Sequence, residues 1–228
     1  GLEWLVYDFI EGVLLSRVDN GLAQDNREAI YVEMGRQLGQ IHQHTCDFFG
    51  SMDEKGNSIH GFTTLKTYFS HLVGKTLKSL HEVEHADPHL IRKAESAFLT
   101  LLNSMEDEPT ATLCHNDFGP RNILVSEDRG KYTLKAVIDF EQSVPTDRAK
   151  ELIDVYLPLL EREKQLASGF RLGYELFGTI DVDRLLAKRD FYNLFCGLSI
   201  CAWSKDVDYL YYLEGARLLE KTLARMSK

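Results

Sequence analysis

A cluster of polar residues lies between two apolar segments at positions 113–125, where the sequence reads LCHNDFGPRNILV. A solvated loop has no need of Leu113 and Cys114 before it or of ILV after it, because apolar side chains gain free energy by leaving water. The two apolar segments therefore predict a loop that is fixed in a core at both ends. The polar side chains of this loop would be presented from a rigid base.

A β-hairpin is predicted directly after this loop. Residues 123–125 and 133–138 are short β-prone segments, and the sequence SEDRG between them is typical of a turn. Residues 1–10, GLEWLVYDFI, are predicted to form an earlier strand that runs into a turn at Glu11 and Gly12.

Most of the remaining sequence follows helical periodicity. Helices are predicted from Asp25, as N-cap, to about His44, at residues 65–80, and at 88–105 after a cap at Asp87. Beyond Arg148 the chain is predicted to be helical almost to its end, with breaks near Pro158, 178–181 and 205–206. We find no repeat or flexible linker, so the expected fold is α+β, mostly α, in one compact unit.

Composition excludes some classes of function. The formal net charge of −9 disfavours nucleic-acid binding and favours a cationic small ligand if the acidic side chains gather at a cleft. The longest uncharged apolar run, at 194–203, falls well short of the roughly 20 residues of a membrane span. No signal-like segment opens the chain and its four cysteines form no CxxC pair, so we expect a cytoplasmic protein.

Three side chains with oxygen atoms are predicted to meet at one edge of the hairpin. Asp117 and Asn122 flank a Gly-Pro pair that forces a tight turn, and Asp139 follows the second strand. A lone carboxylate buried at position 139 would need a metal or a hydrogen-bond partner. Hard oxygen ligands suit Mg²⁺, and phosphoryl transfer needs one Asp to orient the acceptor hydroxyl and an Asn and an Asp on the metal. An Asx-rich turn that only caps the hairpin is the alternative, and the spacing and flanking apolar segments favour the site.

The motif HNDFGPRN followed by VIDFE resembles the catalytic and metal-binding loops of the aminoglycoside phosphotransferase family, whose pattern is H-G-D-x-x-x-x-N followed by I-D-F/W-E/G. Asn116 replaces the usual Gly, a mild change because Asn tolerates positive φ. LVYDFIEGVLL similarly resembles the family's hinge. The resemblance extends from residue 2 to about 155.

This resemblance implies a protein-kinase-like C-terminal lobe, with residues 1–12 as the hinge strand and turn and 13–228 as the helical lobe. It also implies roles for individual residues. The assignments are Asp117 as the catalytic residue with His115 supporting its loop, Asn122 and Asp139 as Mg²⁺ ligands, and Tyr7, Phe9 and Ile10 at the adenine of ATP or GTP.

Downstream of the metal-binding Asp, the family usually has a further pair of acidic residues. Asp147 and Glu151 stand at the corresponding positions of this chain. A helix N-cap with an acidic residue in the first turn explains both equally well, so the two interpretations stay open. A kinase of this family also carries a β-rich lobe before the hinge, with a phosphate-covering loop and a strand Lys. Because the chain starts almost at the hinge, we expect a fragment that binds ATP poorly and turns over slowly.

Two functions follow from these patterns. The first is an enzyme that transfers the γ-phosphoryl group of ATP or GTP to a hydroxyl of an aminoglycoside-like or amino-bearing metabolite, with antibiotic resistance as one role. The second is a non-catalytic module that binds a partner or regulates it. A glycine-rich hairpin and a strand Lys in the upstream coding sequence would favour the enzyme.

Overall fold

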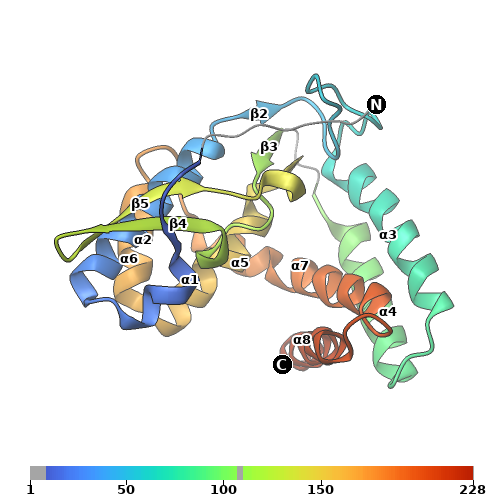
Figure 1. Ribbon diagram of the computed structural model, residues 1–228. Coiled ribbons are helices and arrows are strands. Elements are labelled where there is room, and N and C mark those ends of the chain that lie inside the picture. Colours follow the sequence, from blue (N-terminus) through green and yellow to red (C-terminus); the bar gives the residue numbers. More distant parts are fainter. Residues whose placement is uncertain (1–8, 107–109, 228) are drawn as a thin grey trace, which may run out of the picture. The chain divides into compact units, whose positions relative to one another are not determined.

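The computed structural model describes residues 9–106 and 110–227 (Figure 1). Helices dominate and two small sheets accompany them, which confirms the predicted α+β, mostly α class. The strands are β1 (Val13–Leu14), β2 (Thr45–Cys46), β3 (Ala111–Cys114), β4 (Ile123–Asp128), β5 (Lys131–Val137) and β6 (Val144–Thr146). The α-helices are α1 (Leu15–Val18), α2 (Gln24–Ile41), α3 (Leu65–Glu82), α4 (Pro88–Ser104), α5 (Arg148–Arg162), α6 (Lys164–Tyr174), α7 (Val182–Trp203) and α8 (Tyr209–Met226), and the 3₁₀ turns are η1 (Asp19–Gly21), η2 (Pro120–Asn122) and η3 (Phe140–Gln142).

The chain divides into two compact units, where the sequence predicted one. The first unit comprises Gly1–His44, Cys114–Ser143 and Asp154–Ile180, and the second comprises Thr45–Leu113, Val144–Ile153 and Asp181–Lys228. Each unit is assembled from segments that are distant in sequence, so local patterns could not reveal the division. The boundary predicted after residue 12 stays a prediction.

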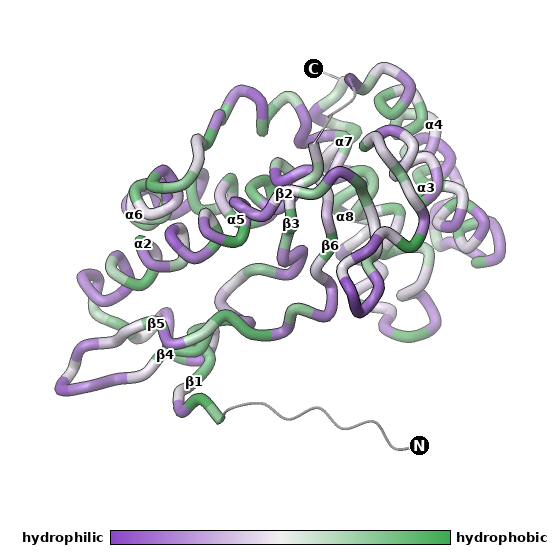
Figure 2. Tube along the Cα trace, turned by 90° about the horizontal axis from the view of Figure 1, so that it is seen from above, coloured by the Kyte–Doolittle hydropathy of each residue, from purple (hydrophilic) through white to green (hydrophobic). Residues whose placement is uncertain are grey.

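Helices α2 and α6 form the base of the first unit and lie side by side (Figures 1 and 2). Glycines let their backbones approach closely. A Cβ atom added at Gly35 would lie 1.9 Å from the carbonyl oxygen of Phe170, and one at Gly173 would lie 1.9 Å from that of Val32. No side chain fits at either position, so the helices contact each other backbone to backbone.

The predicted hairpin is present in the first unit. β4 pairs with β5 and β1 in an antiparallel sheet of order β1-β4-β5. The turn is shorter than predicted, since only Arg129 and Gly130 separate the two strands. Both residues have positive φ, 53° and 80°, which is the turn geometry that matches the twist of the strands. The tip is hydrophilic (Figure 2). Asn26 of α2 holds it, since its Nδ2 donates to the Gly130 oxygen at 3.0 Å and its Oδ1 accepts from the Tyr132 amide at 3.2 Å.

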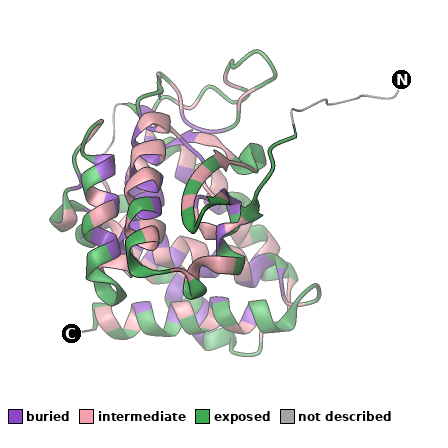
Figure 3. Ribbon diagram, turned by 60° about the vertical axis from the view of Figure 1, so that its left-hand side comes forward, coloured by how far each residue is buried: buried purple, intermediate pink, exposed green. Residues whose placement is uncertain are grey.

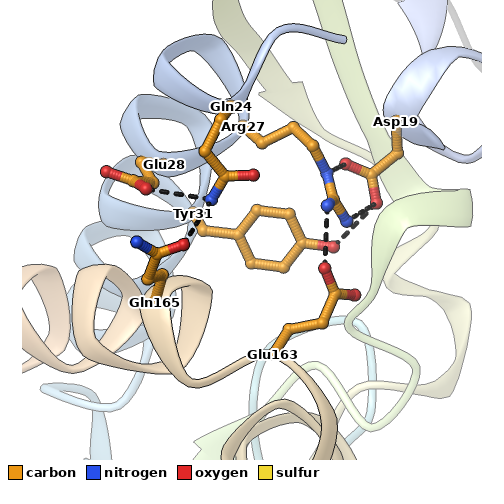
Figure 4. A network of polar contacts seen from close by, with 7 residues as sticks. All are labelled: Asp19, Gln24, Arg27, Glu28, Tyr31, Glu163 and Gln165. Carbon is orange, nitrogen blue, oxygen red and sulfur yellow. Dashed lines mark hydrogen bonds and ion pairs between the residues drawn. The ribbon is translucent and has the colours of Figure 1, made fainter. Parts of the chain in front are cut away.

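A polar network joins the segment after β1 to the α2–α6 base (Figure 4). Arg27 Nε donates to Asp19 at 3.0 Å and Arg27 Nη1 to Glu163 at 2.7 Å, while the Tyr31 hydroxyl donates to Asp19 at 3.0 Å. Hydrogen bonds to Asp19 and Glu163 raise the pKa of Arg27, and burial, assisted by Asp19, raises the pKa of Tyr31. The network therefore secures η1 to α2 and to the residue that separates α5 from α6.

An aromatic core fills the second unit. Phe69 of α3 contacts Phe191 and Phe195 of α7 edge-on, with ring centroids 5.0 Å apart in both pairs. Phe98 of α4 stacks on Phe191 at 5.0 Å. These pairs join three helices, and buried and exposed residues alternate along helices of the protein as expected for amphipathic segments (Figure 3).

Most predicted helix ends are confirmed and two are wrong. Asp87 caps α4 by accepting from the amides of His89 and Leu90, and the breaks at 178–181 and 205–206 are present. Helix α2 begins at Gln24, which leaves Asp25 in its first turn, where its charge still complements the helix dipole. Helix α5 continues through Pro158, so the break predicted there is absent, although proline cannot donate the backbone hydrogen bond of that helix position.

The expected first strand falls mainly outside the described residues, and Phe9 to Gly12 adopt no regular structure. The first strand in the described part of the chain begins at Val13. Within the part of the chain that the structure describes, no helix combines the length and apolarity that crossing a bilayer requires.

Replacing Gly35 by Ala is predicted to lower the free energy of unfolding by about 3 kcal/mol, since the new methyl group would force α2 away from α6. Helix propensity alone would favour Ala by roughly 1 kcal/mol. Gly74→Ala in α3 is the matched control, because no atom lies within 4 Å of its added Cβ, and it should stabilise the protein. Chemical denaturation measures both, and equal effects of the two variants would contradict the close helix contact.

Candidate functional site

The polar loop after β3 is fixed by the buried ring of His115, which is fully removed from solvent. His115 Nδ1 accepts the Asp117 amide hydrogen at 3.3 Å, so the ring hydrogen resides on Nε2, which donates to the Ile138 carbonyl oxygen at 2.9 Å. The ring also contacts Phe118 and Phe140, with centroids 5.9 and 4.5 Å away. One side chain thus joins the loop to the end of β5.

Two residues at this site have left-handed backbone conformations, Asn116 with φ 65° and Asp139 with φ 66°. Asn and Asp adopt this region more easily than other residues with a Cβ. The expectation that Asn can stand at position 116 in place of Gly agrees with this geometry. Such backbone conformations gather at functional sites, where the surrounding contacts impose them.

The structure brings Asp117 and Asn122 together. Asn122 Nδ2 donates to the Asp117 carbonyl oxygen at 2.8 Å and to Asp117 Oδ2 at 2.9 Å. Asn122 is buried and the Asp117 side chain is 25% exposed. The other carboxylate oxygen, Oδ1, forms an ion pair with Arg121, a partner that the sequence analysis missed although the i, i+4 spacing was visible.

Asp139 lies beside this pair along the backbone. Ile123 pairs with Val137, and the Ile138 amide donates to the Asn122 carbonyl oxygen at 3.0 Å, so residue 139 leaves β5 next to η2. Asp139 has a left-handed backbone and is exposed, so its carboxylate needs no partner to offset burial.

The donor set fits a divalent cation of the Mg²⁺ type. The Asn122 amide nitrogen donates two hydrogen bonds to Asp117, and the Oδ1 atom of the same side chain is the one that can bind a metal ion. Asp139 offers an accessible carboxylate. Mg²⁺ typically binds one or two protein oxygens and retains several waters, which suits a site with one buried and one exposed ligand.

The predicted adenine-binding residues lie near the start of the chain. Tyr7 lies outside the described residues. Phe9 is 92% exposed and Ile10 is 43% exposed, and neither hydrogen-bonds to the Asp117 loop within the described part of the chain. Their role at a nucleotide stays a prediction.

Asp147 is a helix cap in the second unit. Its Oδ1 accepts from the Ala149 amide at 3.0 Å, and its Oδ2 accepts from Lys188 Nζ at 2.6 Å and from the Tyr192 hydroxyl at 2.7 Å. These contacts hold the start of α5 against α7 and favour the capping interpretation. Glu151 is buried in the first turn of α5.

Comparison with known proteins gives one family and a set of related folds. The profile of the phosphotransferase enzyme family matches residues 1–185. No curated protein sequence matches the chain significantly.

Solved structures of three proteins illustrate the fold. A thermostable mutant of aminoglycoside phosphotransferase APH(4)-Ia, in ternary complex with AMP-PNP and hygromycin B, matches with a TM-score of 0.64 and 18% identity over 94% of this chain and 69% of that one. The GDP and kanamycin complex of APH(2")-IIia matches with a TM-score of 0.56 and 17% identity over 96% and 70%. Plasmodium vivax ethanolamine kinase matches with a TM-score of 0.52 and 16% identity over 94% and 63%. At these identities the likeness shows the fold, and it confirms the predicted kinase-like architecture.

Replacing His115 by Phe is predicted to lower the free energy of unfolding by roughly 1–3 kcal/mol for each hydrogen bond lost, because the Asp117 amide and the Ile138 carbonyl would lose their partner. The exposed His89 provides the control, and His89→Phe should change stability by less than about 0.5 kcal/mol. Chemical denaturation compares the variants, and hydrogen exchange at the Asp117 amide should be faster in His115→Phe alone. Unchanged exchange there would count against the bridging role of the ring.

Proposed function

The chain belongs to the phosphotransferase enzyme family, and from that premise we propose that it transfers the γ-phosphoryl group of ATP or GTP to a hydroxyl group of a small molecule. One observation carries the proposal: the Asp117 carboxylate is held by Asn122 on a loop that His115 fixes to the hairpin. Phosphoryl transfer depends on positioning and on charge neutralisation more than on covalent chemistry. A carboxylate on a rigid loop supplies the positioning.

Asp117 would accept a hydrogen bond from the acceptor hydroxyl and take its proton as the oxygen attacks phosphorus. The hydrogen bond from Asn122 Nδ2 keeps one carboxylate oxygen in place, so the acceptor would bind at the other. Asn122 and Asp139 would hold Mg²⁺, which neutralises charge on the phosphate oxygens when it is bound. His115 would act through the loop, because its two nitrogens already bind backbone groups.

We propose an amino-bearing acceptor. The structures with this fold are named for complexes with hygromycin B and kanamycin and for an ethanolamine kinase, and all three small molecules carry amino groups. The net charge of −9 would attract such cations. A screen of nucleotide consumption by the product of the complete coding sequence, against aminoglycosides and amino alcohols, tests the proposal. Nucleotide binding without transfer to any hydroxyl compound would favour the non-catalytic module instead.

Asp117→Asn should reduce kcat by about 10²–10⁴-fold, because the amide cannot take the proton of the acceptor. Stability should change little, since the side chains are nearly isosteric. Asp128→Asn at the exposed hairpin tip is the control and should retain full activity. Steady-state kinetics with circular dichroism checks both variants, and normal turnover by Asp117→Asn would remove this residue from the mechanism.

Asp139→Ala should weaken Mg²⁺-dependent nucleotide binding, because Asn122 would be left as the sole protein ligand of the cation. Titration calorimetry with nucleotide in the presence and absence of Mg²⁺ isolates the metal-dependent part of the affinity. Asp128→Ala removes an equally exposed carboxylate away from the site and should bind normally. A metal-dependent affinity that Asp139→Ala preserves would show that the cation is held elsewhere.

A further inference from the structure

Arg121 is a cation on the catalytic loop that the proposed reaction has not yet used. Its guanidinium forms an ion pair with Asp117 Oδ1, while Asn122 occupies Asp117 Oδ2. The Arg121 side chain is 71% exposed, against 25% for its partner. Both oxygens of the carboxylate are therefore engaged in the structure, one by a buried amide and the other by an exposed cation.

The backbone that carries Arg121 is part of a hydrogen-bonded turn, although the side chain is exposed. Arg121 is the middle residue of η2, which Pro120 opens and which the Asn122 amide closes by donating to the Gly119 carbonyl oxygen at 2.9 Å. An exposed ion pair typically contributes little to stability, because water screens the two charges. The guanidinium can therefore exchange its partner at little cost while the loop keeps its shape.

The charges around Arg121 favour its movement from Asp117 to a bound triphosphate. Arg121 is the one Lys or Arg in residues 115–122 and 138–142, and the same two segments contain Asp117, Asp139 and Glu141. A triphosphate would add several more negative charges beside them. The planar guanidinium binds phosphate oxygens with two parallel hydrogen bonds, which makes it a strong partner for such a group.

We propose that Arg121 is a catalytic residue that leaves Asp117 on nucleotide binding and contacts the γ-phosphoryl group, an assignment that rests on the proposed function. The exchange has a second effect on the same carboxylate. It frees Asp117 Oδ1 to accept the hydrogen bond of the acceptor hydroxyl, while Asn122 still holds Oδ2. Nucleotide binding would thus supply charge neutralisation and make Asp117 available in one movement.

These groups account for each bond and proton in the transfer step. The acceptor oxygen forms a bond to the γ-phosphorus as the bond from that phosphorus to the bridging β,γ-oxygen breaks, and the nucleoside diphosphate leaves with the electron pair. The acceptor proton passes to Asp117. Arg121 keeps its protons and stabilises the charge on the non-bridging oxygens throughout.

Binding measurements test the contact without requiring turnover. Arg121→Met should weaken binding of a non-hydrolysable triphosphate at least roughly tenfold, as expected for a lost charge-assisted hydrogen bond, and leave diphosphate binding nearly unchanged. Arg129→Met, at the 95% exposed hairpin tip, makes the same change in charge and should alter neither affinity. An equal loss for triphosphate and diphosphate would overturn the proposal, because Arg121 would then act on the loop and not on the γ-phosphate.

Kinetics of the product of the complete coding sequence provides the second test. Arg121→Gly should lower kcat by about 10²-fold or more with a smaller change in the acceptor KM, and added guanidinium chloride at millimolar concentration should restore part of the rate. A kcat within twofold of the wild type would overturn the proposal.

The two proposals fail in different ways. If the wild-type protein transfers no phosphoryl group, the proposed enzymatic activity is refuted. The ratio of triphosphate to diphosphate affinity in Arg121→Met then still decides whether Arg121 contacts the γ-phosphate. A wild-type protein that binds no nucleotide refutes both.

Discussion

The candidate site depends on one interaction, the bridge that the His115 ring makes between the Asp117 amide and the Ile138 carbonyl. Asp117 and Asp139 belong to different segments of sequence, and this buried ring is a side-chain link between the backbones that carry them. Because one ring nitrogen must accept and the other must donate, the bridge requires a neutral imidazole in a single tautomer. A change at His115 would therefore act on the position of both carboxylates.

Other contacts in the first unit hold the two ends of this bridge in place. The hairpin fixes residue 138 opposite Asn122, and Asn26 ties the hairpin tip to α2. Helix α2 is in turn locked to α6 by the backbone contacts at Gly35 and Gly173. Arg27 secures the segment after β1 to the same base through Asp19 and Glu163. The loop is thus connected through the hairpin to α2, and through α2 to α6.

Much of the site could be predicted from the sequence, since its chemistry is local. The spacing of Asp117 and Asn122 around a Gly-Pro turn was enough to place them together, and Asn was expected to tolerate the positive φ that the structure shows at position 116. The exposure of Asp139 could not be predicted, because alternation along β5 does not reveal that a left-handed residue follows the strand. The partners of Asp147 lie more than 40 positions away on α7, and the division into two units joins distant segments, so periodicity contained no signal for either.

The side chains of the loop differ in burial and in the partners that they bind. His115 and Asn122 are buried and bind backbone groups, so they fix the loop whether or not a ligand is present. Arg121 and Asp139 are exposed, and their side chains can change partners without breaking a buried hydrogen bond. The proposed function needs both properties, since the base would have to be positioned before the reaction while charge compensation would arrive with the phosphates. Placing the carboxylate of Asp117 between one buried and one exposed partner meets both needs with a single side chain.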